Sequence, residues 1–259
     1  MQLDGQIALV TGAGQGIGKA CALALAQAGA DIAGVDINQA AIDALGPQIE
    51  AIGRRYLGLK ADVGDVQAID RFVGQTHATF GKIDILVNNA GVTRRAFIMD
   101  LTEEDWDRIH RVNAKGVFFC LQRVARDMIE RDGGRIVNIA SIAGKGFVGA
   151  SNAIYAASKG AVISLTKTAA QQLGPYDITV NSVCPGLTET EMYQGIIETA
   201  AAKEGVSIEA IRARMVETVP IRRANSPQDI AAMVVFLASP DARNVTGQSL
   251  NVDGGVIPD

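Results

Sequence analysis

The stretch Thr11-Gly12-Ala13-Gly14-Gln15-Gly16-Ile17-Gly18 decides how the rest of the chain is interpreted. It follows an apolar run, residues 7–10, and opens a small-residue stretch, residues 15–28, that we expect to be helical. Glycines between a strand and a helix let the backbone turn tightly and approach a pyrophosphate, and the N–H groups at the helix start attract an anion. Ile17 stands where the pattern G-x-G-x-x-G has its third glycine, so a simple tight turn is the alternative. Because the glycine stretch follows the first expected strand, a dinucleotide-binding site is favoured over a simple turn.

Apolar runs alternate with helix-like segments along the chain. The runs are residues 7–10, 31–35, 56–60, 83–87, 135–139, 178–183 and 250–252, and helices are expected at 15–28, 39–52, 65–80, 153–173, and from 102 and 226 onward. Continuous apolar runs are typical of parallel strands that are covered on both faces. We therefore predict a single-domain α/β fold over residues 1–259, a Rossmann-type doubly wound parallel sheet with helices on both faces.

One long segment interrupts this alternation. Residues 186–222 separate two elements of the expected sheet and are predicted to be helical in two pieces. Long segments of this kind often cover active sites. We predict a substrate lid at about residues 187–222.

Asp36 closes the second expected strand, 18 residues beyond Gly18. A carboxylate here can accept hydrogen bonds from the adenosine ribose hydroxyls and would repel a 2′-phosphate. The following Ile37, Asn38 and Gln39 offer no cation to such a phosphate. This favours NAD over NADP, the alternative for Asp36 being a solvated turn residue.

Composition excludes several classes of function. Of the 259 residues, 48% are hydrophobic and 20% charged, and the net charge is -4, which disfavours nucleic acid or an anionic membrane as partner. No apolar run approaches the roughly 20 residues of a membrane span, and the first residues do not resemble a signal peptide. Three scattered cysteines predict buried thiols in a cytoplasmic protein. The two histidines lack metal-site spacing, so no metal is expected.

Further motifs follow in order along the chain. They are Asp62-Val63, Asn88-Asn89-Ala90-Gly91, Asn113, Ser141, Tyr155-x3-Lys159, Pro185-Gly186 and Asp253-Gly254-Gly255. Together with the glycine loop, this series resembles the short-chain dehydrogenase/reductase family over almost the whole chain. The resemblance implies an oxidoreductase with a nicotinamide cofactor and a dimer or tetramer, of which we expect the homotetramer.

The resemblance also implies roles for individual residues. It places Asn113, Ser141, Tyr155 and Lys159 in a catalytic tetrad, in which Asn113 would hold a water. Asp62 and Val63 would contact the adenine, Asn89, Ala90 and Gly91 the adenosine ribose, and Thr188 and Thr190 the nicotinamide carboxamide. The full expected set of cofactor contacts is Gly12, Gln15, Gly16, Ile17, Gly18, Asp36, Asp62, Val63, Asn89, Ala90, Gly91, Tyr155, Lys159, Pro185, Gly186, Thr188 and Thr190.

The chemistry of Tyr155 and Lys159 can be argued from the residues themselves. Four residues apart on a helix, both project from one face. A nearby ammonium should lower the pKa of the tyrosine from about 10, and two to three units would need roughly 3–4 kcal/mol. Tyr155 would then take the hydroxyl proton while Ser141 donates to the substrate oxygen. An ordinary half-buried tyrosine and a solvated lysine are the alternatives.

Ser141 and Tyr155 are 14 residues apart, one more than the commonest family spacing. We therefore expect residues 145–152 to bulge. Ser151 and Asn152 could face the substrate, but capping of the following helix is the favoured prediction.

The first prediction for function is an NAD-dependent oxidoreductase that moves a hydride between nicotinamide and a small-molecule substrate, namely a polyol, sugar or small secondary alcohol or its ketone. Residues 186–222 resemble the corresponding segment of polyol and butanediol dehydrogenases. The alternative is a 3-oxoacyl-carrier-protein reductase, and steroid or bile-acid dehydrogenation is a third possibility. An inactive nucleotide-binding regulator is disfavoured because all four tetrad residues are present.

Overall fold

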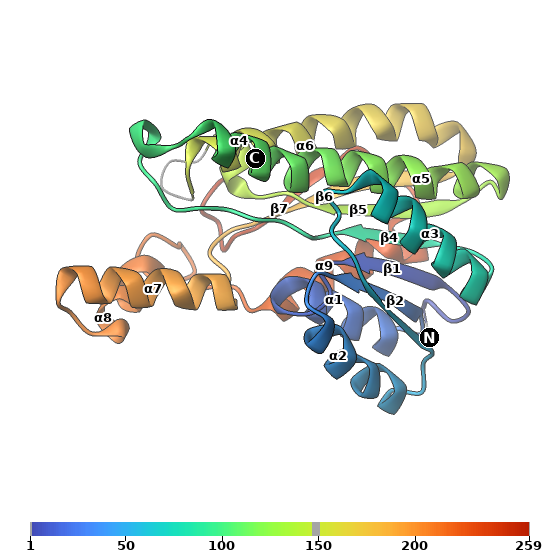
Figure 1. Ribbon diagram of the computed structural model, residues 1–259, viewed down its shortest axis with the longest axis horizontal. Coiled ribbons are helices and arrows are strands. Elements are labelled where there is room, and N and C mark those ends of the chain that lie inside the picture. The colour runs from blue at the N-terminus through green and yellow to red at the C-terminus, as the bar shows by residue number, and fades with distance from the viewer. Residues whose placement is uncertain (1, 147–150, 259) are drawn as a thin grey trace.

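The computed structural model describes residues 2–146 and 151–258, which form one seven-stranded parallel sheet flanked by helices (Figure 1). The strand order is β3-β2-β1-β4-β5-β6-β7. The strands are β1 (Ile7–Thr11), β2 (Asp31–Asp36), β3 (Tyr56–Lys60), β4 (Ile85–Asn88), β5 (Gly134–Ile139), β6 (Ile178–Pro185) and β7 (Ser249–Val252). The predicted doubly wound fold is confirmed.

Two layers of helices bury the two faces of this sheet. One layer is α1 (Gly16–Gln27), α2 (Gln39–Ala51) and α9 (Pro227–Ala238), and the other is α3 (Val66–Phe80), α5 (Val117–Glu130) and α6 (Ala153–Leu173). Within β1, Ala8 and Val10 pack into the first layer and Leu9 into the second. Because alternate side chains enter different cores, the strand is apolar from Ile7 to Val10, and only Thr11 at its carboxyl end is polar.

The order of the strands brings two loops together. The chain runs outward from β1 to β3 and then crosses to β4 on the other side of β1. The loops after β1 and β4 therefore flank a crevice at the carboxyl ends of the strands, where ligands of such sheets bind. They are joined by the hydroxyl of Thr11, which accepts hydrogen bonds from the amides of Asn89 and Ala90, at 3.1 and 3.2 Å.

The helical region expected from residue 102 onward is divided. It begins with α4 (Glu103–His110), capped by Thr102, and passes through a π-helical turn, Arg111–Gly116, into α5. The wider turn carries Asn113, whose side chain is buried. π-Helical turns inside helices often lie at functional sites.

The two helical pieces predicted between β6 and β7 are α7 (Glu191–Glu204) and α8 (Ile208–Val216). Together they extend to one side of the molecule (Figure 1). Tyr193, Ile197, Ala201 and Ile211 form a small core between them. In the part of the chain that the structure describes, no helix is long and apolar enough to span a membrane.

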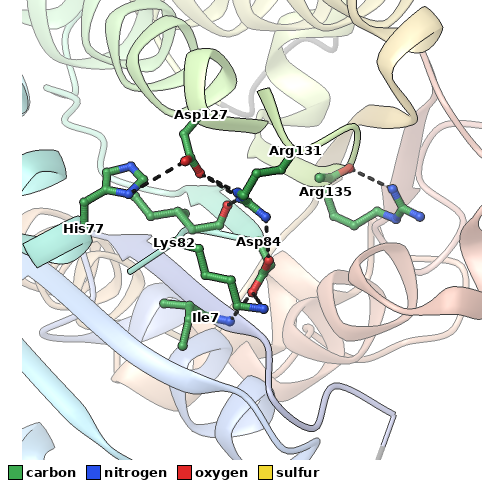
Figure 2. A network of polar contacts seen from close by, with 9 residues as sticks. Ile7, His77, Lys82, Asp84, Asp127, Arg131 and Arg135 are labelled. Atoms are coloured by element: carbon green, nitrogen blue, oxygen red, sulfur yellow. Dashed lines mark hydrogen bonds and ion pairs between the residues drawn. The ribbon is translucent and has the colours of Figure 1, made fainter. Parts of the chain in front are cut away.

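A polar network holds the amino ends of the strands, opposite the crevice (Figure 2). The buried carboxylate of Asp84 accepts hydrogen bonds from the Ile7 amide at 2.8 Å and from Arg131 at 3.1 Å, and it pairs with Lys82 at 2.9 Å. Arg131 also binds Asp127 at 2.7 Å. This network stabilises the amino ends of the strands and lies far from the loops at their carboxyl ends.

Candidate active site

The glycine loop after β1 is packed so closely that two of its residues must be glycine. Gly12 has φ +65°, and a Cβ there would lie 2.8 Å from the amide nitrogen of Asn89. A Cβ on Gly18 would lie only 1.9 Å from the carbonyl oxygen of Gly12. Gly18 is therefore the close-packing glycine in this loop, although Ile17 occupies the expected third position.

The start of α1 suits an anion. Its first residue after the cap is Gly16, and the side chain of Gln15 at the cap makes no capping hydrogen bond. By contrast, Asn38, Asp65 and Asn152 cap the starts of α2, α3 and α6. Uncapped N–H groups at a helix start, next to closely packed glycines, fit a pyrophosphate.

Asp36 is fixed beside this loop by two backbone amides. Its carboxylate accepts hydrogen bonds from Gly14 at 3.0 Å and from Asn38 at 2.9 Å. The negative charge therefore stays at the end of β2, where an adenosine ribose bound to the loop would meet it.

Asp62, after β3, is held by a different set of partners. It accepts hydrogen bonds from the Gly64 amide at 2.8 Å and from Arg111 at 2.7 Å. Burial favours a raised pKa, but the bonds from Arg111 and Gly64 outweigh it and lower the pKa of this carboxyl. The neighbouring Val63 is buried against the π-helical turn at Gly116.

The loop after β4 links the glycine loop to the predicted tetrad. The side-chain amide of Asn89 donates to the carbonyls of Thr11 and Gly12, each at 3.1 Å. A Cβ on Gly91 would lie 3.5 Å from the ammonium of Lys159 and 3.4 Å from the side-chain oxygen of Asn113. Residues 89–91, including Ala90, thus contact the glycine loop on one side and the predicted tetrad on the other.

Ser141, Tyr155 and Lys159 meet at the ends of β5 and α6. Ser141 follows β5 and lies close enough to the phenol of Tyr155 to lower the pKa of that phenol, while its own oxygen accepts from the Ala143 amide at 3.1 Å. Lys159 is buried and donates to the carbonyl of Ile139 at 2.7 Å. The structure therefore brings these three predicted residues together.

The predicted direction of the Tyr155 pKa is wrong for this structure. Burial raises the pKa of the phenol, and the hydrogen bond with Ser141 lowers it by less. Burial lowers the pKa of Lys159 to about 8, and its ammonium is directed to Ile139. The ammonium of Lys159 is thus directed away from the phenol, and burial disfavours its charged form, so that it does not offset the effect of burial on Tyr155.

Both polar atoms of the Asn113 side chain are hydrogen-bonded within the protein. Its oxygen accepts from the Val92 amide at 2.8 Å, and its nitrogen donates to the Val92 carbonyl at 2.9 Å and to Ser158 at 3.1 Å. These bonds attach the π-helical turn to the loop after β4 and to α6. Its role in holding a water stays a prediction.

Asn152 caps α6, as predicted, by accepting a hydrogen bond from the Tyr155 amide at 2.8 Å. The neighbouring hydroxyl of Ser151 lies 3.1 Å from that of Thr93. The bulge predicted at residues 145–152 falls partly on residues 147–150, outside the described residues.

The remaining predicted contacts lie between β6 and α7. Pro185 ends β6, the Gly186 amide donates to Val252 at 2.9 Å, and the Thr188 hydroxyl donates to the Gly186 carbonyl at 3.0 Å. Thr190 caps α7.

The structure also shows a contact of Glu191 that was not predicted from the sequence. A Cβ on Gly16 would lie 3.3 Å from a carboxylate oxygen of Glu191 and 3.3 Å from the Thr190 methyl. The first turn of α7 therefore lies against the glycine loop. Only the tertiary structure places it there, since 175 residues separate Gly16 from Glu191 in the sequence.

The three cysteines are buried, as predicted. Across residues 2–146 and 151–258, no three His, Cys, Asp or Glu side chains lie where they could hold a metal ion together.

Comparison with known proteins agrees with this geometry. A family model described as enoyl-(acyl carrier protein) reductase matches residues 12–257. The 3-oxoacyl-[acyl-carrier-protein] reductase FabG of Thermotoga maritima is 39% identical over 258 residues, which cover 99% of this chain and 100% of the relative. The (2S)-[(R)-hydroxy(phenyl)methyl]succinyl-CoA dehydrogenase subunit BbsD of Thauera aromatica is 40% identical, with 98% of each chain covered.

Among solved structures, an NAD+-bound xylitol dehydrogenase superimposes with a TM-score of 0.92. It is 37% identical, and the match covers 98% of this chain and 100% of that one. The likeness extends over the sheet, both helical layers and the segment that contains α7 and α8.

Proposed function

Because the chain belongs to the short-chain dehydrogenase/reductase family, whose members are oxidoreductases of CH–OH groups with a nicotinamide cofactor, we propose that it interconverts 3-oxoacyl and 3-hydroxyacyl thioesters with NAD(H). The observation that carries this proposal is the Ser141–Tyr155 pair, which lies with Lys159 beside Gly91 at the crevice. This arrangement supplies a hydrogen-bond donor and a proton carrier for one carbonyl or carbinol oxygen.

The nicotinamide, when bound, supplies or accepts the hydride. The glycine loop and the start of α1 would hold its pyrophosphate, and Asp36 would hold the adenosine ribose. Ser141 would orient the substrate oxygen by a hydrogen bond. Tyr155 would give a proton to that oxygen in reduction and take it back in oxidation.

The raised pKa of Tyr155 favours reduction at neutral pH. Burial keeps the phenol protonated, and a protonated phenol is the form that donates to a developing alkoxide. Oxidation needs the phenolate and should therefore gain from alkaline pH.

The relatives support a thioester substrate over a polyol. Besides the Thermotoga maritima enzyme, relatives in a Synechocystis strain and in Vibrio harveyi are named 3-oxoacyl-[acyl-carrier-protein] reductases, at 39% and 37% identity. The name of BbsD describes a secondary alcohol within a coenzyme A thioester. These relatives favour the alternative of the sequence analysis over its first prediction.

Asp36 supports NAD(H) as the cofactor. Its charge is held by Gly14 and Asn38 where a 2′-phosphate would lie, and that phosphate would be repelled. We therefore propose an enzyme that acts on 3-oxoacyl thioesters, as its relatives' names suggest, but takes NAD(H), because the Asp36 carboxylate would repel the 2′-phosphate of NADP(H).

The second candidate is oxidation of a polyol, sugar or small secondary alcohol. It is favoured by the likeness to the NAD+-bound xylitol dehydrogenase, which includes the predicted lid at residues 187–222. The lid function, a homotetramer and a cytoplasmic location stay predictions.

The deciding experiment measures absorbance at the NADH band. Purified protein is given NADH or NADPH with acetoacetyl-CoA, and NAD or NADP with 3-hydroxybutyryl-CoA, xylitol, sorbitol and 2,3-butanediol. Turnover of the thioesters with NADH at a rate that exceeds NADPH supports the proposal. Turnover of a polyol alone would replace the proposal with the second candidate. Turnover only with NADPH would show that Asp36 does not select NAD(H).

A further inference from the structure

The chain segment after Gly91 is fixed from two sides. Both the amide and the carbonyl of Val92 are bonded to the side chain of Asn113, at 2.8 and 2.9 Å. The next residues, Thr93 and Arg94, are contacted by Asn152 at the start of α6. The segment 92–94 is thus held between the π-helical turn and the helix that carries the predicted catalytic residues.

Asn152 makes two kinds of contact through one amide. Its oxygen accepts from the Tyr155 amide at 2.8 Å and so caps α6. Its nitrogen donates to the Thr93 hydroxyl at 3.3 Å and to the Arg94 carbonyl. With 6% of its surface exposed, the side chain is shielded from the water that would otherwise compete for these bonds.

The other contacts of this segment come from Ser151, whose hydroxyl lies 3.1 Å from that of Thr93, and from α4. Arg108 donates to the Thr93 carbonyl at 3.3 Å, and the guanidinium of Arg94 pairs with Asp105. Both partners lie in α4 and not in α6. Asn152, three positions before Tyr155, instead joins the segment directly to the start of α6.

We propose that Asn152 is a positioning residue, which fixes the start of α6, and with it Tyr155, against residues 93–94 as one wall of the substrate site. This inference rests on the proposed role of Tyr155 in proton transfer. The chemistry needs an amide, because a serine can accept the capping bond but is too short to reach Arg94 as well. Asn152 sets the distance between the phenol and the wall, while the cofactor loop is left unchanged.

Two variants separate the cap from the link. Asn152→Ser keeps a capping oxygen and removes the bonds to Thr93 and Arg94, whereas Asn152→Ala removes both functions. Asn244→Ser, in an exposed loop beyond α9, is the matched control. Hydrogen–deuterium exchange, which needs no substrate, is measured on peptides covering residues 92–97 and 153–158.

In Asn152→Ser we expect faster exchange in residues 92–97 only, and in Asn152→Ala faster exchange in both peptides. With the alcohol or thioester that the wild type turns over, Asn152→Ser should raise KM about tenfold, the effect of losing one or two shielded hydrogen bonds. NADH affinity, followed by its fluorescence, should stay unchanged.

Two outcomes would overturn the inference. One is wild-type exchange in residues 92–97 of Asn152→Ser. The other is a loss of NADH affinity in Asn152→Ser as large as its loss of substrate affinity, because this result would indicate that Asn152 has only a general structural role. Absence of thioester turnover by the wild type would instead count against the proposed function, because the exchange measurement stands without it.

Discussion

The ammonium nitrogen of Lys159 lies 5.8 Å from the centre of the Tyr155 ring and donates its hydrogen bond to the carbonyl of Ile139. The neighbour that lowers the pKa of the phenol is instead Ser141, and burial raises that pKa by more. The protein by itself therefore keeps the Tyr155 phenol protonated, and burial lowers the pKa of the Lys159 ammonium to about 8. Several measurable consequences arise from this arrangement and from the packing around it.

Tyr155→Phe should abolish hydride transfer without unfolding the protein. The variant keeps the ring and loses only the hydroxyl that carries the proton, so the rate should fall about 10²–10⁴-fold. NADH oxidation gives the rate, and thermal unfolding and NADH fluorescence give stability and binding. Retention of more than a tenth of the rate would show that another group carries the proton.

Asp36→Ser should weaken the preference for NAD(H). Removing the carboxylate removes both the ribose acceptor and the repulsion of a 2′-phosphate, so the NAD-to-NADP ratio of kcat/KM should fall about tenfold or more. Asp43→Ser is the matched control, because Asp43 is exposed on α2 and binds Gln39. Equal effects of both substitutions would mean that general charge, not contact, sets the preference.

Gly18→Ala should disrupt the glycine loop. The added Cβ would lie 1.9 Å from the Gly12 carbonyl, so the backbone must shift, at a cost of about 1–3 kcal/mol in unfolding free energy. NADH affinity should fall with it. The control is Gly74→Ala in α3, where a Cβ meets nothing within 4 Å and should add about 1 kcal/mol of stability. Urea unfolding of both variants tests the contrast in sign.

Lys159 should make stability depend on alkaline pH. Burial lowers its pKa from 10.5 to about 8, so between these values the unfolded chain binds a proton that the folded protein does not. The free energy of unfolding should therefore rise with pH in this window, by about 2 kcal/mol between pH 7.5 and 10 relative to Lys159→Met. Urea unfolding of both proteins at pH 7.5 and 10 measures it. Parallel pH curves would mean that Lys159 has an ordinary pKa in the folded state.

Asp84→Ala should lower stability and leave the chemistry unchanged. The substitution strips the Ile7 amide and Arg131 of a buried partner, which costs about 3 kcal/mol. Lys82→Ala, which removes a partly exposed partner of Asp84 (Figure 2), should cost less than 1 kcal/mol. The activity of the folded fraction at 25 °C should match the wild type for both, since the network lies at the opposite end of the strands.

The sequence by itself determined most of the sheet, because burial on both faces makes the central strands β1, β2 and β4 largely apolar, and the helices between the strands follow from spacing. It also determined the cap at Asn152 and the positions of Gly12 and Gly18, since short-range backbone geometry dictates these residue types. The helices at 39–51, 66–80 and 153–173 lie within two residues of their predicted ends.

Only the tertiary structure decided how the predicted site residues act on one another. The pKa of Tyr155 depends on its burial and on where the Lys159 ammonium points, and neither follows from their four-residue spacing. The π-helical turn around Asn113 depends on bonds to Val92, a residue on a different segment. Such effects come from desolvation and from long-range hydrogen bonds, which exist only after distant segments have packed together.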